Sequence, residues 1–123
     1  MISREDAVVM SILDLAASLV EEGWCQNAWA CNADGADRVE TDSDATAWCL
    51  AGAIRRAGYD LCASRLLTDR ALTYVWKVNG ASVPNSEWND MPGRKAAEVV
   101  ALLKRAAQEI DAVWGHEGRG EGS

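Results

Sequence analysis

The sequence predicts a mainly α-helical domain in which four or five helices pack as one small bundle. Apolar residues recur at steps of three and four in several segments, which is the spacing of one face of an α-helix. A chain of 123 residues can bury one core but is too short for two. Residues 24–40 lose the helical period. We therefore expect one globular domain over residues 1–114, with a short β-hairpin or ordered loop near 24–40.

The first helix is expected to begin at Ser3 and to end at Gly23. Ser3 with Asp6 three residues later is typical of a capped helix start, and glycine often follows a helix. Between them an apolar stripe repeats at helical spacing, formed by Val8, Ile12, Leu15 and Leu19. The Asp34-Gly35 pair that follows is a turn signal, and it supports the hairpin in the 24–40 segment.

The middle of the chain predicts two further helical segments. Asp42, Ser43 or Asp44 can cap a second helix, which we expect Gly58 to stop. Apolar residues from Leu61 to Val78 then indicate one helix or two short ones, ended by Asn79-Gly80.

The last helix has the clearest apolar stripe, made of Val99, Leu103, Ala106, Ile110 and Val113. Two prolines and several Asn and Ser residues make 81–93 a predicted loop. We expect Asp90 to cap the last helix. The glycine-rich residues 115–123 predict a disordered tail.

Net charge narrows the classes of partner. The chain carries a net charge of −7, and residues 1–60 hold eleven acidic residues against four basic ones. Such a surface repels phosphate backbones, so we expect no direct nucleic-acid binding. It suits a basic protein surface, and the partner-binding candidates are Asp34, Asp37, Glu40, Asp42 and Asp44. Solubility alone also explains an acidic surface, and an apolar helix face could instead pair two copies of the chain.

Cofactor, metal and membrane signals are weak in this sequence. No apolar run approaches the roughly 20 residues of a membrane span, and the N-terminus lacks a signal-peptide pattern, so we expect a cytoplasmic protein. The four cysteines lack the close pairs of a zinc site. A calcium loop with Gly35 at its sixth position would have Ala30 and Thr41 where it needs an Asp and a Glu ligand. No glycine-rich phosphate loop is present. The sequence predicts neither metal nor cofactor.

Tryptophan points to the best candidate for a functional centre. Four of the six tryptophans lie in three short polar motifs, at 23–35, 47–58 and 87–94. A buried indole needs an acceptor for its N–H group, and amides beside it can recognise a ligand. The ligand-pocket candidates are therefore Trp24, Gln26, Asn27, Trp29, Trp48, Trp88, Asn89 and Asp90. Spacing alone does not show whether they meet in space, and Asn89 and Asp90 also suit loop and cap roles.

Cys49 is the sharpest catalytic candidate. It falls in the first turns of the predicted second helix, where amide dipoles lower a thiol pKa. Asn89 or Asp90 could orient a base, but the one histidine, His116, lies in the predicted tail. A buried small residue beside Trp48 is the simpler interpretation of Cys49.

At these motifs the chain resembles an uncharacterised family of short proteins from phages and from bacterial genomes, catalogued as a domain of unknown function. The matching residues are Gly23, Trp24 or Cys25, Gln26, Ala28, Ala33, Asp34 and Gly35; Trp48, Cys49, Gly52 and Ala53; and Trp88, Asn89, Asp90, Pro92 and Arg94. Family members often have Thr where this chain has Lys95. The resemblance implies no activity, but its phage association favours a protein that binds a host or defence complex.

These observations leave three hypotheses. The first is a small, acidic, non-catalytic phage-type accessory protein that binds a protein partner, with a counter-defence inhibitor as one form of it. The second is a cysteine-dependent hydrolase or transferase centred on Cys49. The third is a small-ligand-binding protein that uses the tryptophan motifs.

Overall fold

The fold was determined as a computed structural model, which describes the backbone of residues 2–121 and the side chains of residues 2–110. This part of the chain forms five helices and three very short strands. In chain order they are α1 (Arg4–Glu22), β1 (Ala30–Cys31), β2 (Asp37–Arg38), β3 (Ala47–Trp48), α2 (Leu50–Asp60), α3 (Arg65–Val78), α4 (Asn85–Asn89) and α5 (Ala96–Glu121). The predicted mainly α bundle with a small β element is confirmed.

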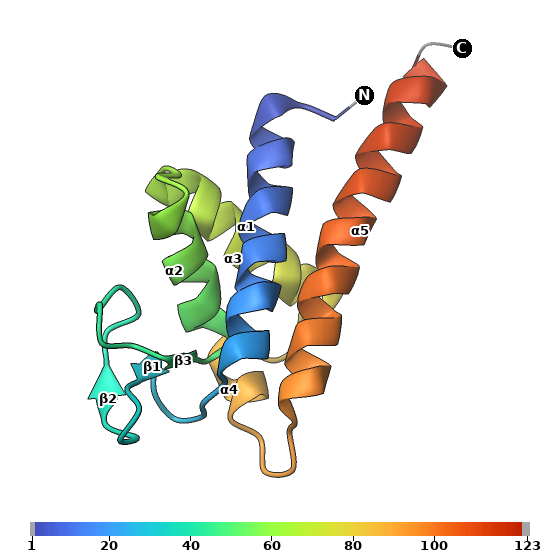
Figure 1. The fold of residues 1–123 in the computed structure, drawn as a ribbon. Coiled ribbons are helices and arrows are strands. Elements are labelled where there is room, and N and C mark those ends of the chain that lie inside the picture. Colours follow the sequence, from blue (N-terminus) through green and yellow to red (C-terminus); the bar gives the residue numbers. More distant parts are fainter. Residues whose placement is uncertain (1, 122–123) are drawn as a thin grey trace.

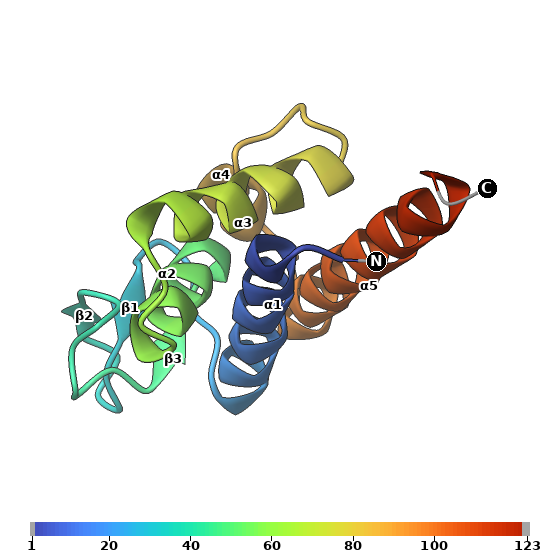
Figure 2. The same ribbon diagram turned by 90° about the horizontal axis from the view of Figure 1, so that it is seen from above.

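Helix α1 is the central element of the bundle. It packs against α5 on one side and against α2 and α3 on the other (Figures 1 and 2). The small sheet lies at one end of the bundle, beside the start of α2 and near α4 (Figure 1). The candidate motifs therefore gather at the end of the molecule opposite the N-terminus.

The cap of α1 agrees with the sequence, but its buried face is rotated. The Ser3 side chain accepts a hydrogen bond from the Asp6 amide, and Gly23 follows the helix, as predicted. Val8 and Leu15 are only half-buried, whereas the core face consists of Val9, Ile12, Leu13, Ala16, Ala17, Leu19 and Val20. Neighbouring helices cover α1 on two sides. The buried face is therefore broader than a single row of residues, and its centre is shifted from the predicted stripe.

The 24–40 segment forms the first part of a three-stranded antiparallel sheet with the order β2-β1-β3. Cys31 of β1 pairs with Asp37 on one side and with Ala47 on the other. Trp24 forms a parallel bridge to Trp48, so residues 24–30 wrap around the end of β3. Gly23 permits this approach, because a Cβ atom there would lie 2.2 Å from the Thr46 carbonyl oxygen.

The predicted start and stop of the second helix were both wrong. Residues 47 and 48 pair as β3, and the helix begins only at Leu50, with Cys49 as its N-cap. Asp42 forms a local turn instead, in which its carboxylate accepts a hydrogen bond from the Asp44 amide at 2.8 Å. Gly58 is buried inside α2, where a Cβ atom would meet the Thr68 hydroxyl oxygen at 2.2 Å. The glycine therefore serves helix packing, and α2 continues to Asp60.

The 81–93 loop contains a short helix that the sequence did not predict. Helix α3 ends at Asn79-Gly80 as expected, and α4 follows after Pro84. Asp90 ends α4 and does not cap α5, which begins only at Ala96. Asp90 instead lies beside the 24–30 segment, where its carboxylate accepts a hydrogen bond from the Asn27 amide.

Helix α5 enters the region for which a tail was predicted. Its buried residues include Val99, Leu103, Ala106 and Ile110, which confirms the predicted stripe up to that point. Val113 and His116 lie outside the residues whose side chains are described, and the disorder of 115–123 stays a prediction. Within residues 2–121, no helix has the length and apolar character that a membrane crossing requires.

Candidate functional site

The three tryptophan motifs meet at Asn89, whose side chain is fully buried. Its Oδ1 atom accepts hydrogen bonds from Trp24 Nε1 at 2.7 Å and from the Leu50 amide at 3.0 Å. Its Nδ2 atom donates to the Cys25 carbonyl oxygen at 3.2 Å and to Asp90 Oδ1 at 2.9 Å. All the hydrogen-bonding capacity of this amide is thus used to join the first motif, the start of α2 and α4.

Gln26 and Asp90 complete this connection. Gln26 Nε2 donates to the carbonyl oxygens of Asn89 at 3.0 Å and of Met91 at 3.1 Å. Asp90 Oδ1 also accepts from the Asn27 amide at 2.8 Å. These bonds hold the residues after α4 against the 24–30 segment.

Trp48 and Trp88 are likewise engaged within the protein. Trp48 Nε1 donates to the Glu40 carbonyl oxygen at 3.0 Å, and its side chain belongs to the core. The Arg94 guanidinium lies 3.8 Å from the centre of the Trp88 ring, and Arg94 Nε donates to the Trp88 carbonyl oxygen. The predicted ligand candidates Trp24, Gln26, Trp48, Trp88 and Asn89 therefore come together, but none of them lines the pocket described next.

A pocket of about 310 Å³ opens beside this hydrogen-bonded centre. It is lined by Asn27, Ala28, Trp29, Asp37, Arg38, Cys49, Ser86 and Asp90. Three ligand candidates, Asn27, Trp29 and Asp90, lie in its wall together with the catalytic candidate Cys49 and the acidic candidate Asp37. Arg38 and Ser86 also line the pocket, and neither was predicted from the sequence as a site residue. Ser86 lies four residues before Asp90, so on a helix the two side chains share one face. This spacing could have predicted Ser86 as a lining residue, but only if the short helix α4 had been predicted first.

Gly52 explains how Trp29 is positioned at the pocket. The Trp29 carbonyl oxygen accepts a hydrogen bond from the Cys49 amide at 3.2 Å, so its backbone lies against the first turn of α2. A Cβ atom at position 52 would lie 2.0 Å from that oxygen. Only glycine fits there, which gives the spacing between Cys49 and Gly52 a structural reason.

The environment of Cys49 does not activate its thiol. Cys49 is 3% exposed and caps α2, with its Sγ atom accepting a hydrogen bond from the Gly52 amide at 3.2 Å. Burial raises the pKa of Cys49, and this effect exceeds the lowering by the amides of Gly52 and Ala51, while the Asp90 charge raises it further. The expected lowering of the pKa was therefore wrong, because desolvation outweighs the helix terminus.

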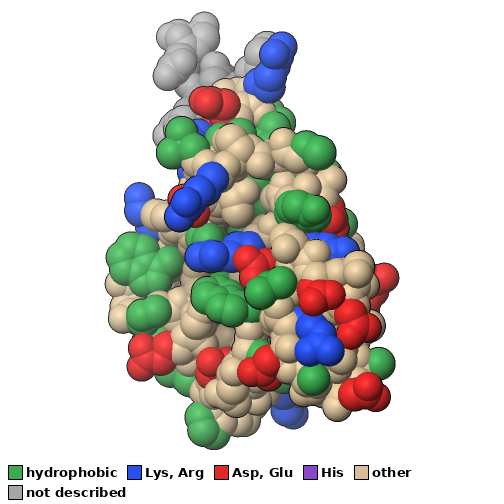
Figure 3. Space-filling model, turned by 90° about the vertical axis from the view of Figure 1, so that its left-hand side faces the viewer, with side chains coloured by type: hydrophobic (Ala, Val, Ile, Leu, Met, Phe, Trp, Pro, Cys, Tyr) green, Lys and Arg blue, Asp and Glu red, His purple; other side chains and the backbone are tan. Residues whose placement is uncertain are grey.

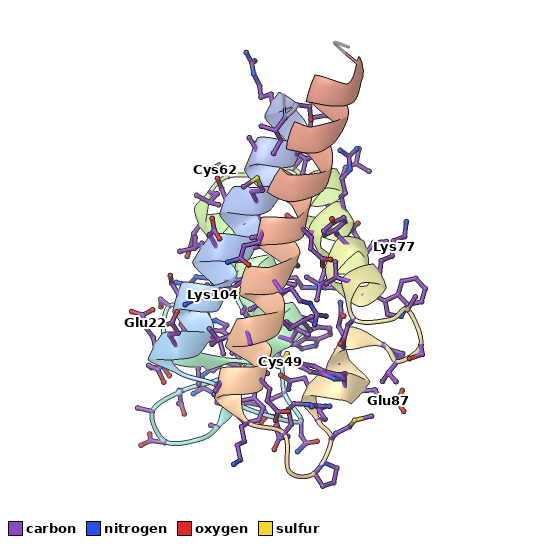
Figure 4. The ribbon with its side chains drawn as sticks, turned by 90° about the vertical axis from the view of Figure 1, so that its right-hand side faces the viewer. Glu22, Cys49, Cys62, Lys77, Glu87 and Lys104 are labelled. Carbon is purple, nitrogen blue, oxygen red and sulfur yellow. The ribbon has the colours of Figure 1, made fainter. Side chains whose placement is uncertain are left out.

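One other feature weakens a cysteine-enzyme arrangement. Asn89 uses its whole amide in structural bonds, so it is not free to orient a base. Figure 4 shows Cys49 inside the molecule near α4, whereas Cys62 lies toward the far end of α2. Cys62 is exposed, Cys49 is buried, and both are free thiols.

Cys25 and Cys31 are close enough for their thiols to interact. Burial, followed by a hydrogen bond and charge repulsion between the two thiols, raises the pKa of Cys25. Among the described side chains, no three His, Cys, Asp or Glu residues are arranged to hold a metal ion. Cys25 and Cys31 are both free cysteines and half-buried.

The acidic 34–44 segment is more neutralised than its sequence indicates. Arg38 Nε lies 3.3 Å from Asp44 and 3.9 Å from Asp42, and an Arg55 nitrogen lies 3.9 Å from Glu40. Among the described residues, Asp34 and Asp37 have no such ion pair. Figure 3 shows this face, where acidic side chains gather with basic side chains among them. Of the five predicted partner-binding residues, only Asp34 and Asp37 thus keep a negative charge without an ion pair in the described part of the chain.

Comparison with known proteins identifies a family and nothing more. The model of the family of unknown function DUF6197 matches residues 4–109, so the chain belongs to that family. No curated protein and no solved structure matches the chain. The predicted resemblance to an uncharacterised family is therefore confirmed, while the phage association stays a prediction.

Proposed function

We propose that this member of the DUF6197 family is a non-catalytic binding protein whose pocket receives a basic group of a partner protein. One observation carries the proposal. Asp37 and Asp90 line the same pocket, and within the described residues neither carboxylate has an ion-pair partner. Carboxylates in a concave site attract cations more strongly than the same groups on an open surface.

The one basic residue of the pocket does not cancel this charge. Arg38 Nε is directed to Asp44 and Asp42, and its NH1 atom donates to the Asp37 main-chain carbonyl at 2.8 Å. Its positive charge is thus balanced outside the pocket. The Asp37 and Asp90 carboxylates are left as the net negative charge of the wall.

The raised pKa of Cys49 favours binding over catalysis. A cysteine nucleophile acts as thiolate, and the buried Cys49 thiol is protonated at neutral pH. The proposal includes the phage-type accessory role. In that role the partner is a protein of a host or defence complex, which the binding inhibits. The acidic contact that we propose is narrower than the original five residues, because only Asp37 of that set lines the pocket.

The proposal is tested with a synthetic peptide that alternates basic residues and glycine, titrated calorimetrically at low salt. Asp37→Asn and Asp90→Asn remove charge and keep an amide oxygen, so Asp90→Asn can still accept from Asn27. We expect each variant to bind roughly fivefold or more weakly, consistent with the loss of a charged contact. Asp34→Asn is the matched control, since Asp34 lies in the same acidic segment outside the pocket.

Two results would count against this function. Equal binding of the wild type and both pocket variants would show that the pocket carboxylates are not the contact. An equal loss in the Asp34→Asn control would indicate general charge attraction. A free small cation that binds with the affinity of the peptide would favour the small-ligand alternative at the same pocket.

A further inference from the structure

We infer that the basic group is a guanidinium, and that the pocket holds an arginine side chain of the partner stacked on Trp29. This inference rests on the proposed function and adds the identity of the group. It depends on Trp29, on the acceptors that the pocket leaves free, and on the rigidity of Asp90.

Trp29 already stacks with a guanidinium within the protein. The residue is 43% exposed, and the Arg55 guanidinium carbon lies 4.6 Å from the centre of the indole ring. Trp29 also lines the pocket, so the pocket and this exposed residue coincide. A flat cation gains both electrostatic attraction and contact area on an indole face.

The pocket contains hydrogen-bond acceptors that no protein group uses, and they suit a ligand group whose N–H bonds point in several directions. Within the described residues, no hydrogen bond uses Asp90 Oδ2, the Asp37 carboxylate or the Ser86 hydroxyl. The Asn27 side-chain amide is free in the same sense, and all four residues line one pocket. A guanidinium presents five N–H donors in a plane, whereas an ammonium concentrates three donors at one point. Several unused acceptors that line one pocket therefore favour arginine over lysine.

Asp90 is positioned before any ligand binds. Its Oδ1 atom is fixed by the Asn27 amide at 2.8 Å and by Asn89 Nδ2 at 2.9 Å, which orients Oδ2 without further ordering. A preorganised acceptor lowers the entropic cost of binding. The adjacent Cys49 thiol is 3% exposed, so one part of the wall is poorly hydrated and strengthens a charged contact there.

The test compares three small probes by NMR titration of the full chain. N-acetyl-arginine methylamide is the ligand, its lysine counterpart keeps the charge, and its citrulline counterpart keeps the shape without the charge. We expect the arginine probe to bind about fivefold or more tightly than the lysine probe, with a shift of the Trp29 indole resonance. The citrulline probe should show no binding in the same range.

Variants separate stacking from charge. Trp29→Leu should reduce arginine binding to about the lysine level, because the lysine probe gains less from the ring. Trp76→Leu is the matched control, since Trp76 is half-buried on α3 and belongs to a different surface. Asp90→Asn should weaken both charged probes.

The outcomes distinguish this inference from the proposed function. Equal arginine and lysine affinity, both sensitive to Asp90→Asn, would overturn the guanidinium inference and leave a basic-group pocket intact. Absence of arginine binding would also overturn it, and if the basic peptide then bound independently of Asp37 and Asp90, the proposed function would fail as well. Binding of inorganic phosphate at Arg38 in place of the cationic probes would contradict both.

Discussion

Trp24 Nε1 donates a hydrogen bond of 2.7 Å to Oδ1 of Asn89, although the two residues are 65 positions apart in the chain. The same oxygen accepts the Leu50 amide, the first residue of α2. One buried amide therefore joins the 24–25 segment to α2 and α4. The pocket beside it depends on this junction, because Asn27 and Asp90 in its wall are joined to it by hydrogen bonds.

Asn89→Ala should strongly destabilise the protein. The substitution leaves Trp24 Nε1, the Leu50 amide and the Cys25 carbonyl without their partner in a buried region. Each unsatisfied buried group costs about 1–3 kcal/mol, so we expect the free energy of unfolding to fall by roughly 3 kcal/mol or more. Urea denaturation measures the change.

Asn79→Ala is the control for this prediction. Asn79 follows α3, and its side chain makes no hydrogen bond within the described residues. Its substitution should change the free energy of unfolding by less than about 0.5 kcal/mol. Similar losses at positions 79 and 89 would show that the Asn89 network contributes nothing special.

The sequence predicted α1, α3 and α5, but it misplaced both ends of α2 and did not predict α4. Periodicity and caps predicted α1 and the core face of α5, because each signal lies within a few neighbouring residues. The junction at Asn89 could not be derived, since a hydrogen bond across 65 positions leaves no local pattern. The start of α2 was misplaced because three acidic or hydroxyl residues at 42–44 are good caps, while Cys49, a poor cap by propensity, occupies that position.

The pocket was only partly predictable for a related reason. Trp29, Asn27 and Asp90 were chosen as polar and aromatic motif residues, and they do line it. Trp24 and Trp88 belong to the same class of residue but serve the scaffold. Composition does not separate these two roles, because the role depends on which side of the chain each residue faces after 24–30 wraps around β3.

Gly58→Ala should destabilise the contact between α2 and α3. Alanine favours a helix, but the new Cβ atom would lie 2.2 Å from Thr68 Oγ1 and 3.1 Å from Thr68 Cγ2. Overpacking of this kind costs about 1–3 kcal/mol, which exceeds the helix preference of roughly 1 kcal/mol. Thermal or urea unfolding should therefore show a net loss of stability.

The double variant Gly58→Ala with Thr68→Ala tests the cause. Thr68→Ala removes both clashing atoms and also the hydrogen bond from its hydroxyl to the Ser64 carbonyl at 3.1 Å. The double variant should lose less stability than the sum of the two single changes. Additive losses would show that the Thr68 side chain is not what excludes a larger residue.

Lys95→Thr should stabilise α5. The Lys95 amide already donates to Glu98 Oε1 at 2.9 Å, which is one half of a capping box at the start of the helix. A threonine hydroxyl at position 95 can accept from the Glu98 amide and supply the other half. We expect a gain of about 1 kcal/mol in the free energy of unfolding, measured by urea denaturation.

Lys95→Ala is the matched control, because it removes the lysine without adding an acceptor. Its effect should be smaller than about 0.5 kcal/mol. The gain from Lys95→Thr should also shrink when Glu98 is replaced by alanine, since both residues form the same box. An undiminished gain in that background would contradict the capping explanation.

Alkylation at neutral pH should discriminate among the cysteines, and it decides whether Cys49 is a nucleophile. Burial raises the pKa values of Cys25 and Cys49, so their thiolate fractions at pH 7 lie below that of an ordinary thiol. We expect Cys62, which is exposed, to react first with iodoacetamide, and Cys49 to react at least about tenfold more slowly, as read by peptide mass spectrometry.

The Cys62→Ser variant should lose the fast phase and leave the slow one. Raising the pH should increase the Cys49 rate, because burial raises the pKa of this thiol and deprotonation requires a higher pH. If Cys49 instead reacted faster than Cys62 at pH 7, the thiol would be activated and the cysteine-enzyme hypothesis would replace the binding function.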